Sequence, residues 1–240
     1  MERALDLVVA TGNPHKLDEL RALLADVPVR LLGLQDLPPG RRPEMPEETG
    51  ATFEANADLK ATHVARAAGM WALADDSGFE VPGLGGRPGV ISARFAGVDG
   101  ERAAVDLANN RKLIAEARAA GLFGRGHRLA GDRPGGAAPF SEAPAARFRC
   151  VLSVASADGR VACRGVGACE GVLVEDARGA GGFGYDPHFL VPGLGRTFAE
   201  LGPGEKNRIS HRARALADLR RSLVPLLAAA TLPPTEKPIP

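Results

Sequence analysis

Hydrophobic and polar positions follow two different periods along this chain. An apolar run at 5–10 ends in a Gly-Asn-Pro turn, and leucines then recur at helical spacing, between charged residues, as far as position 24. A second apolar run follows at 29–34. The chain therefore opens with strand, loop, helix and strand, an order that is typical of α/β proteins.

The same two periods predict the later elements. Thr52 is a suitable N-cap for a helix, and Gly69 is a suitable residue to end it. An Asp-Gly pair between two alternating runs is a strong hairpin signal. The elements expected are a helix between Thr52 and Gly69, a strand at 71–78 that runs into a turn, a helix at 101–120, a hairpin around Asp158-Gly159 and one long helix after Gly204.

Segments rich in glycine and proline separate these elements. Residues 83–100 and 179–195 are expected to be loops, and 121–146 a mobile surface insert, because they have little apolar periodicity. The tail at 231–240 is rich in proline and is expected to be disordered. Residues 1–230 then form a single domain that carries the insert.

The composition is that of an ordinary globular protein. The chain has 240 residues, of which 45% are apolar and 25% charged, and its formal net charge is +1. A near-neutral chain is poorly suited to non-specific nucleic-acid binding, which depends on many phosphate contacts. No apolar stretch reaches the about 20 residues that a membrane-spanning helix needs, and the start of the chain does not resemble a signal peptide. We therefore expect a soluble cytoplasmic protein with no nucleic-acid or membrane partner.

The first polar cluster of interest lies between the first strand and the first helix. Backbone N–H groups at a helix start bind anions, and a lysine there adds a positive charge for phosphate. A plain turn with a solvated lysine is an equally good interpretation. The segment is Thr11-Gly12-Asn13-Pro14-His15-Lys16.

A second cluster, Asp75-Asp76-Ser77-Gly78, follows the apolar run at 71–74. Ligands of α/β proteins gather beyond the carboxyl ends of strands, and paired carboxylates there suit Mg²⁺. Glu47 or Glu48 is a candidate for a further carboxylate ligand. The alternative is an acidic turn without a metal, which is common.

Two further clusters lie late in the chain. In the loop at 181–187, Phe183 and Tyr185 offer aromatic faces to a nucleobase and Asp186 a polar partner, unless both rings simply pack inward. On the predicted last helix, one face is expected to present Lys206 and Ser210 together with His211 and Arg212. A solvated helix face is the alternative for this second group.

Seven sequence blocks occur in order between residues 11 and 212, within a stretch of about residues 5–227 that covers nearly the whole chain. They are T-G-N-x-x-K at 11–16, E-E-T-G-x-T-F-x-x-N-A at 47–57, K-A at 60–61, A-D-D-S-G at 74–78, G-G-x-P-G-V-x-S-A-R at 85–94, G-G-F-G-Y-D-P at 181–187 and E-K-N-x-x-S-H-R at 205–212. Together they resemble the inosine/xanthosine triphosphate pyrophosphatases, which hydrolyse deaminated purine nucleotides. The insert and the tail depart from that family but touch none of the blocks.

The resemblance implies both a fold and an activity. The implied fold is an elongated α/β structure, with a central mixed sheet flanked by helices and an active-site cleft between two lobes. The implied activity is Mg²⁺-dependent hydrolysis of the triphosphates of inosine, deoxyinosine and xanthosine to the nucleoside monophosphate and pyrophosphate. A homodimer is implied as well.

Carried over block by block, the resemblance also implies roles for single residues. Asp76 is implied as proton acceptor and metal ligand, and Glu47 as a second metal ligand, with the choice between Glu47 and Glu48 left open. Phosphate binding is implied for Thr11, Gly12, Asn13, Pro14, His15 and Lys16, and contact with the nucleotide for Ser77, Phe183, Gly184, Tyr185, Asp186, Lys206, His211 and Arg212.

Two other functions remain open from the sequence. One is a pyrophosphatase for other modified nucleotides, against which the Phe-Gly-Tyr-Asp block argues. The other is a nucleotide-binding sensor without turnover, against which the acidic residues at 47, 75 and 76 argue. A panel of nucleoside triphosphates with and without Mg²⁺ separates all three.

Overall fold

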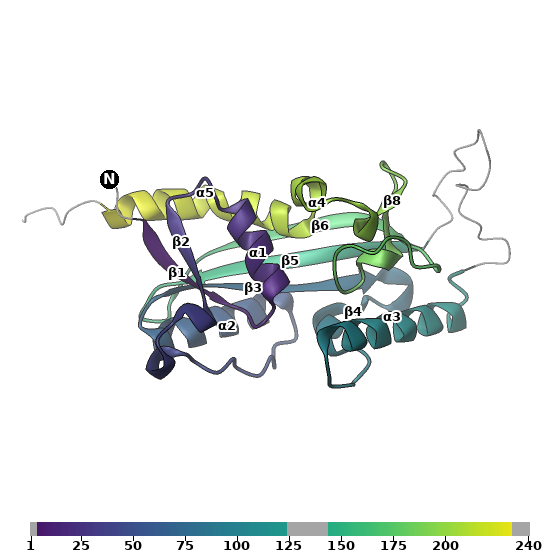
Figure 1. Cartoon of the computed structure of the whole chain (residues 1–240), viewed down its shortest axis with the longest axis horizontal. Helices are drawn as coiled ribbons and strands as arrows, with labels where there is room; N and C mark the ends of the chain where they lie inside the picture. The colour runs from purple at the N-terminus through teal and green to yellow at the C-terminus, as the bar shows by residue number, and fades with distance from the viewer. Residues whose placement is uncertain (1–3, 124–143, 232–240) are drawn as a thin grey trace, which may run out of the picture.

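The computed structural model describes residues 4–123 and 144–231, and within these ranges eight strands form one sheet. The strands are β1 (Leu5–Ala10), β2 (Val29–Gly33), β3 (Trp71–Val81), β4 (Arg87–Pro88), β5 (Ala145–Ala155), β6 (Val161–Leu173), β7 (Phe189–Val191) and β8 (Arg196–Thr197), and the α-helices are α1 (Pro14–Leu23), α2 (Phe53–Ala68), α3 (Arg102–Ala119), α4 (Pro203–Ile209) and α5 (His211–Thr231). The molecule is elongated, and the long strands β3, β5 and β6 run along its length (Figure 1).

The sheet is mixed. Its strand order is β2-β1-β3-β5-β6-β7-β8, with β4 paired to β3. β1 is parallel to both of its neighbours, whereas β3, β5 and β6 pair in antiparallel fashion. The predicted α/β class with a central mixed sheet is therefore confirmed, as is the hairpin around Asp158-Gly159.

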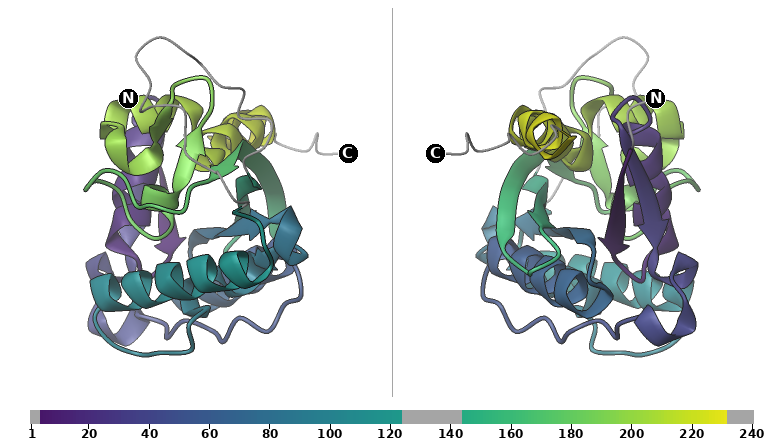
Figure 2. Two further views of the ribbon diagram at one scale, coloured as in Figure 1. Left: turned by 90° about the vertical axis from the view of Figure 1, so that its right-hand side faces the viewer. Right: turned by 90° about the vertical axis from the view of Figure 1, so that its left-hand side faces the viewer.

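Helices cover both faces of the sheet (Figures 1 and 2). Side chains alternate along β3, so that Leu73 packs in one core cluster with α1 and α5, whereas Ala72 and Ala74 pack in another with α2. A third cluster joins Phe79 and Phe189 to apolar side chains of α3. The core is therefore divided among several clusters along the length of the sheet.

Glycines in β6 allow α5 to lie directly on the backbone of the sheet. A Cβ atom at Gly167 would come within 2.2 Å of the backbone nitrogen of Ala215 and 2.3 Å of the backbone oxygen of His211. A Cβ atom at Gly165 would meet the backbone oxygen of Ala215 at 2.2 Å. Only glycine permits this approach, which brings the first turn of α5 down onto the sheet.

Side-chain caps define two helix starts, the one at Thr52 as predicted and a second at Asn13. Thr52 accepts a hydrogen bond from the backbone N–H of Ala55 at 3.1 Å, and Gly69 ends α2 in the left-handed conformation with φ of 64°. Asn13 caps α1 by accepting from the backbone N–H of His15 at 3.0 Å. The two helix starts nearest to the candidate chemistry are thus fixed by local sequence.

The prediction that the strand at 71–78 ends in a turn is wrong. β3 continues through Asp75 and Gly78 to Val81, because β5 pairs with it along this whole stretch. β1, however, stops at Ala10 opposite Ala74. The acidic residues therefore lie inside a strand, at the point where its parallel neighbour has ended.

The prediction of one long closing helix is also wrong. Ser210 has an extended backbone, with φ of −66° and ψ of 160°, and separates α4 from α5. Its hydroxyl accepts from the backbone N–H of Ala213 at 3.2 Å, as an N-cap does. Lys206 and Arg212 therefore belong to two helices rather than to one face of a single helix.

Two segments expected to be loops contain short regular elements. Residues 83–100 include β4 and the 3₁₀ segment η4 (Gly89–Arg94), and 179–195 include β7. These elements are too short to show an apolar period. Most of the predicted insert at 121–146 and of the predicted tail lies outside the described residues, although Thr231 itself ends α5. No helix of the described part of the chain is long and apolar enough to cross a lipid bilayer.

Candidate active site

A pocket of about 440 Å³ opens where β1 has ended and β3 continues. Its walls come from the turn between β1 and α1, from α2, β3, η4 and α3, from the loop at 183–186, and from α4 and α5. The carboxyl end of a parallel strand beside an exposed strand edge is a common place for ligands in α/β folds. β3, the strand that carries the predicted acidic cluster, lines the pocket with residues between Asp75 and Phe79.

Asp75 is the centre of the charge network on one side of β3. Its carboxylate lies 2.6 Å from the ammonium group of Lys16 and 2.7 Å from Nε of Arg212, and it accepts from the hydroxyl of Ser77 at 2.9 Å. Burial opposes the charge on Asp75, but Arg212 and Lys16 outweigh it and lower the pKa well below the ordinary value. A fully buried carboxylate thus fixes two cations against the pocket.

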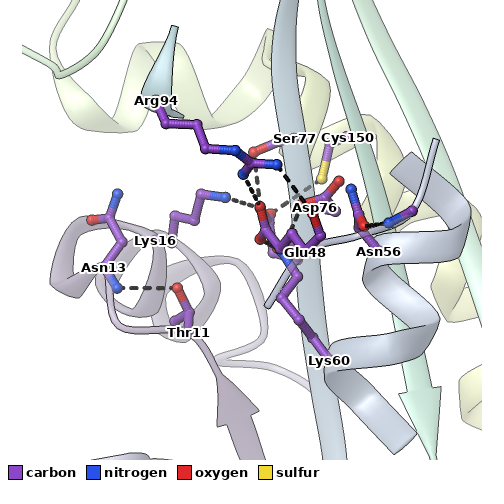
Figure 3. A network of polar contacts seen from close by, with 12 residues as sticks. Thr11, Asn13, Lys16, Glu48, Asn56, Lys60, Asp76, Ser77, Arg94 and Cys150 are labelled. Carbon is purple, nitrogen blue, oxygen red and sulfur yellow. Dashed lines mark hydrogen bonds and ion pairs between the residues drawn. The ribbon is translucent and has the colours of Figure 1, made fainter. Parts of the chain in front are cut away.

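Asp76 points to the opposite face of β3, toward α2, because successive side chains alternate in a strand. Its Oδ1 atom lies 2.6 Å from the ammonium group of Lys60, which also lies 2.6 Å from Oε1 of Glu48. Arg94 contacts the other oxygen of Glu48 at 3.0 Å. Figure 3 shows Arg94, Lys60 and Lys16 reaching from three different elements toward these carboxylates.

The pKa of Asp76 is raised to about 6. Burial is the main cause, and the neighbouring charge of Glu48 adds to it, while Lys60 acts in the opposite direction. For Glu48, burial also opposes the charge, but Lys60 and Arg94 prevail and the pKa is lowered. Two neighbouring carboxylates with pKa values moved in opposite directions are typical of catalytic sites.

The donor set fits a hard divalent cation. The Oδ2 atom of Asp76 is buried and has no hydrogen-bond partner among the described residues. The carboxylate of Glu48 lies close by, because Lys60 contacts both Glu48 and Asp76. No group of three or more His, Cys, Asp or Glu side chains in the described ranges is arranged to hold a metal. Mg²⁺ is commonly bound by one or two carboxylates together with water and substrate phosphates, so Asp76 and Glu48 suffice as protein ligands.

A second network lies at the other end of the pocket. The ammonium group of Lys206 lies 2.7 Å from Oδ2 of Asp186, 3.1 Å from Oε1 of Glu19 and 4.7 Å from the centroid of the Phe183 ring. Glu19 also pairs with Arg212. Asp186 accepts from the backbone N–H of Phe183 at 2.9 Å, so the aromatic loop and α4 are joined by one carboxylate.

His211 lies at the start of α5 with its ring stacked on Phe148, at a centroid distance of 4.7 Å. Its Nδ1 atom is buried without a hydrogen-bond partner within 4–123 and 144–231. Burial lowers the pKa of His211 well below the ordinary value, and the nearby Arg212 and Lys206 charges lower it further. The imidazole is therefore neutral, and it lines the pocket as a hydrogen-bonding group rather than as a cation.

Most of the residues predicted for the site do line this pocket. They are Thr11, Gly12, Asn13, Lys16, Ser77, Phe183, Gly184, Tyr185, Asp186, Lys206, His211 and Arg212.

The other predicted residues lie beside the pocket. Asp76 is behind Lys60 and Glu48, which line it. Pro14 is the first residue of α1, and His15 stacks on the Phe183 ring at 5.5 Å. Glu47 is exposed and lies outside the lining, whereas Glu48 lines the pocket.

Sequence reasoning gave no role to Lys60, Glu19 or Arg94. Lys60 occupies a position on the buried face of α2, and a lysine in an apolar helical stripe is a signal for a buried partner. Arg94 ends a matched block, which was a weaker signal. Glu19 had no signal, because its partners Lys206 and Arg212 lie almost the whole chain away.

The fold and the site together define an α/β protein with a mixed sheet. Its pocket has a cation-bearing helix start and an aromatic loop, and two carboxylates of unequal pKa, Glu48 and Asp76, lie at and beside it. A model of the Ham1 family matches residues 7–128 and 136–222, and the chain belongs to this family. The resemblance carried by the seven sequence blocks is thereby confirmed.

Relatives and solved structures agree with this assignment. The chain is 45% identical over 221 residues to a Thermus thermophilus protein named dITP/XTP pyrophosphatase, covering 91% of this chain and 92% of that protein. An Anaeromyxobacter protein of the same name is 43% identical over 224 residues, covering 91% and 96%. The solved structure of a HAM1 protein from Coxiella burnetii has a TM-score of 0.72 and 35% identity, covering 94% of this chain and 99% of that one.

Proposed function

We propose that this protein hydrolyses the triphosphates of deaminated purines, namely ITP, dITP and XTP, to the nucleoside monophosphate and pyrophosphate. Relatives with this activity in their names support the substrate class. The observation that carries the proposal is the placement of Asp75 and Asp76 on opposite faces of one strand. Asp75 fixes Lys16 and Arg212 beside the pocket, while Asp76 remains a carboxylate of raised pKa.

The triphosphate binds at the start of α1. The turn from Thr11 to Asn13 lines the pocket, and backbone N–H groups at a helix start attract phosphate oxygens. Lys16 and Arg212, which the carboxylate of Asp75 holds in place, add two positive charges. Charge-assisted hydrogen bonds of this kind are about twice as strong as neutral ones.

Asp76 accepts the proton of the attacking water. With a pKa of about 6 it is ionised at neutral pH and still basic enough to take up a proton. The water oxygen bonds to phosphorus, the bond between the α- and β-phosphates breaks, and the electron pair leaves with pyrophosphate. Glu48 and Asp76 are the residues that would hold Mg²⁺, and the ion would neutralise phosphate charge there. Lys60 orients both carboxylates.

The base lies against the aromatic loop. Phe183 offers a ring face, and the ammonium group of Lys206 offers N–H donors that suit the 6-oxo group of hypoxanthine or xanthine. The 6-amino group of adenine would face these donors with its own, and such mismatches cost factors of about 10⁴. The Tyr185 hydroxyl is already committed to the backbone oxygen of Ser92 at 2.8 Å, so Tyr185 supports the loop from within the core.

A substrate panel tests the proposal. Purified protein is given ITP, dITP, XTP, GTP and ATP, each with Mg²⁺ and each with a chelator. Turnover of the three deaminated substrates, dependent on Mg²⁺ and far above that of ATP and GTP, supports the proposal. Equal turnover of GTP and ITP refutes the base selectivity, and tight binding without turnover indicates a sensor. We also propose that two lobes of the chain flank this pocket, and that the protein is a cytoplasmic homodimer. Sedimentation of the full chain tests the dimer.

A further inference from the structure

We infer that Asp106 and Asn110 of α3 are positioning residues, which hold the aromatic loop by the backbone of Gly184 and thereby set the preference for the base. The inference rests on the proposed function. The Oδ2 atom of Asp106 accepts from the backbone N–H of Gly184 at 2.9 Å. Asn110 donates through Nδ2 to the backbone oxygen of the same glycine, also at 2.9 Å.

These two bonds fix both peptide planes that meet at Gly184. The N–H belongs to the peptide shared with Phe183, and the C=O belongs to the peptide shared with Tyr185. Gly184 has φ of 62°, a left-handed conformation that other residues rarely adopt. Its own backbone would be flexible, so orientation must come from outside the loop. The clamp from α3 supplies it.

The direction of the Phe183 ring depends on this clamp. The later half of the loop is anchored independently, because Tyr185 stacks on Phe79 at 5.1 Å and Asp186 pairs with Lys206. Phe183 is only half-buried, and its backbone N–H is tied to Asp186. The peptide that follows Phe183 is the one that Asp106 holds, so Asp106 helps to set how the ring faces the pocket, together with the ring contacts of His15 and Lys206.

The clamp lies along one face of α3. Arg102, Asp106 and Asn110 follow each other at intervals of four residues, which places them on the same side of a helix. Arg102 pairs with the other carboxylate oxygen of Asp106, Oδ1, at 3.0 Å. The Oδ2 atom is left to accept the hydrogen bond from Gly184. Asn110 is buried, and its Oδ1 atom has no hydrogen-bond partner in the described part of the chain. Its side-chain amide is therefore held there by the hydrogen bond that Nδ2 donates to Gly184.

Binding measurements that need no turnover test this inference. The variants Asp106→Ala and Asn110→Leu each remove one bond to Gly184, the first together with the Arg102 ion pair, and Asp106→Asn keeps an acceptor oxygen at the same place. Leu107→Ala is the matched control, because Leu107 lies on the same helix with 51% of its surface exposed. Calorimetry gives the Kd of inosine monophosphate, which carries the base, and of inorganic triphosphate, which lacks it.

We expect Asp106→Ala and Asn110→Leu to weaken inosine monophosphate binding by roughly 3- to 10-fold, as the loss of one hydrogen bond does. Binding of inorganic triphosphate stays unchanged, the ratio of kcat/KM for ITP over ATP falls, and Asp106→Asn restores most of the loss. Equal weakening of both ligands would show a merely structural role. Unchanged binding of inosine monophosphate in Asp106→Ala would overturn the inference outright.

A measurement on the unmodified protein covers the case in which a variant fails to fold. The backbone amide of Gly184 is expected to exchange slowly with solvent deuterium, because Asp106 accepts from it. Rapid exchange of this amide contradicts the clamp. The proposed function fails separately, if the unmodified protein does not cleave ITP at all.

Discussion

The ammonium group of Lys60 lies 2.6 Å from Oδ1 of Asp76, and the other oxygen of that carboxylate is buried without a partner in the part of the chain that the structure describes. One oxygen is thus held in place while the second is left for a proton or a metal ion. Burial raises the pKa of Asp76 to about 6 even though Lys60 acts against it. This pair links the fold to the proposed chemistry, because Lys60 comes from α2 and Asp76 from β3.

Asp76→Asn is expected to abolish most of the activity. The amide keeps the shape of the side chain but neither accepts a proton nor binds a cation well, and loss of a general base costs about 10²–10⁴ in rate. Turnover of ITP is measured for the variant and the unmodified protein at saturating Mg²⁺. Turnover within a few-fold of normal would show that Asp76 is not the base.

The same variant is expected to be more stable than the unmodified protein at pH 7. The folded-state pKa is raised from 3.8 to about 6, so the folded protein binds more protons than the unfolded chain between these values. Stability from this group is therefore complete below about pH 4 and is lost as the pH rises through 6. Removing the titration gains on the order of 1–3 kcal/mol at pH 7.

Denaturant unfolding from pH 4 to pH 8 in chelator measures this difference. The gain of Asp76→Asn over the unmodified protein should grow with pH and level off above 7. A difference that does not change with pH would contradict the raised pKa.

The neighbouring glutamates 47 and 48 provide a matched pair for the metal. Glu48 contacts Lys60 and Arg94 at the pocket, whereas Glu47 is exposed. Glu48→Gln is expected to raise the Mg²⁺ concentration for half-maximal activity by roughly 10-fold or more, and Glu47→Gln to leave it within about 2-fold. The opposite order would restore Glu47 as the ligand.

Gly167→Ala tests the contact that places α5. The added Cβ would lie 2.2–2.3 Å from backbone atoms of Ala215 and His211, which cannot move independently of the helix. We expect a loss of about 1–3 kcal/mol in the free energy of unfolding, together with a raised KM because Arg212 shifts. Gly193→Ala is the control, since no heavy atom lies within 4 Å of the added carbon. Normal stability and KM for Gly167→Ala would show that α5 can adjust without moving the site.

Local signals explain how much of this fold the sequence could predict. Thr52 and Gly69 bound α2 because capping depends on a few neighbouring residues, and the first strand and helix have clear periods. The continuation of β3 past Asp75 was not predictable, because it results from pairing with β5, whose partner residues lie 67 to 75 positions later in the chain. The break at Ser210 was not predictable either, because apolar residues keep helical spacing on both sides of it.

The site divides in the same way. Residues of the seven blocks were identified one by one, and most of them line the pocket. Their mutual arrangement was not accessible, since Asp75 and Arg212 meet only when α5 folds back onto the sheet. Glu19, Asp106 and Asn110 have no distinctive local pattern, and their roles are visible only through the partners that the tertiary structure gives them.

Cleavage between the α- and β-phosphates is tested most directly by phosphorus NMR of inosine triphosphate during a single incubation with the purified protein and Mg²⁺. Phosphorus NMR distinguishes inosine monophosphate and pyrophosphate from inosine diphosphate and inorganic phosphate. We expect monophosphate and pyrophosphate in equal amounts from the first time point, with no diphosphate at any stage. Accumulation of inosine diphosphate with free phosphate would contradict this expectation.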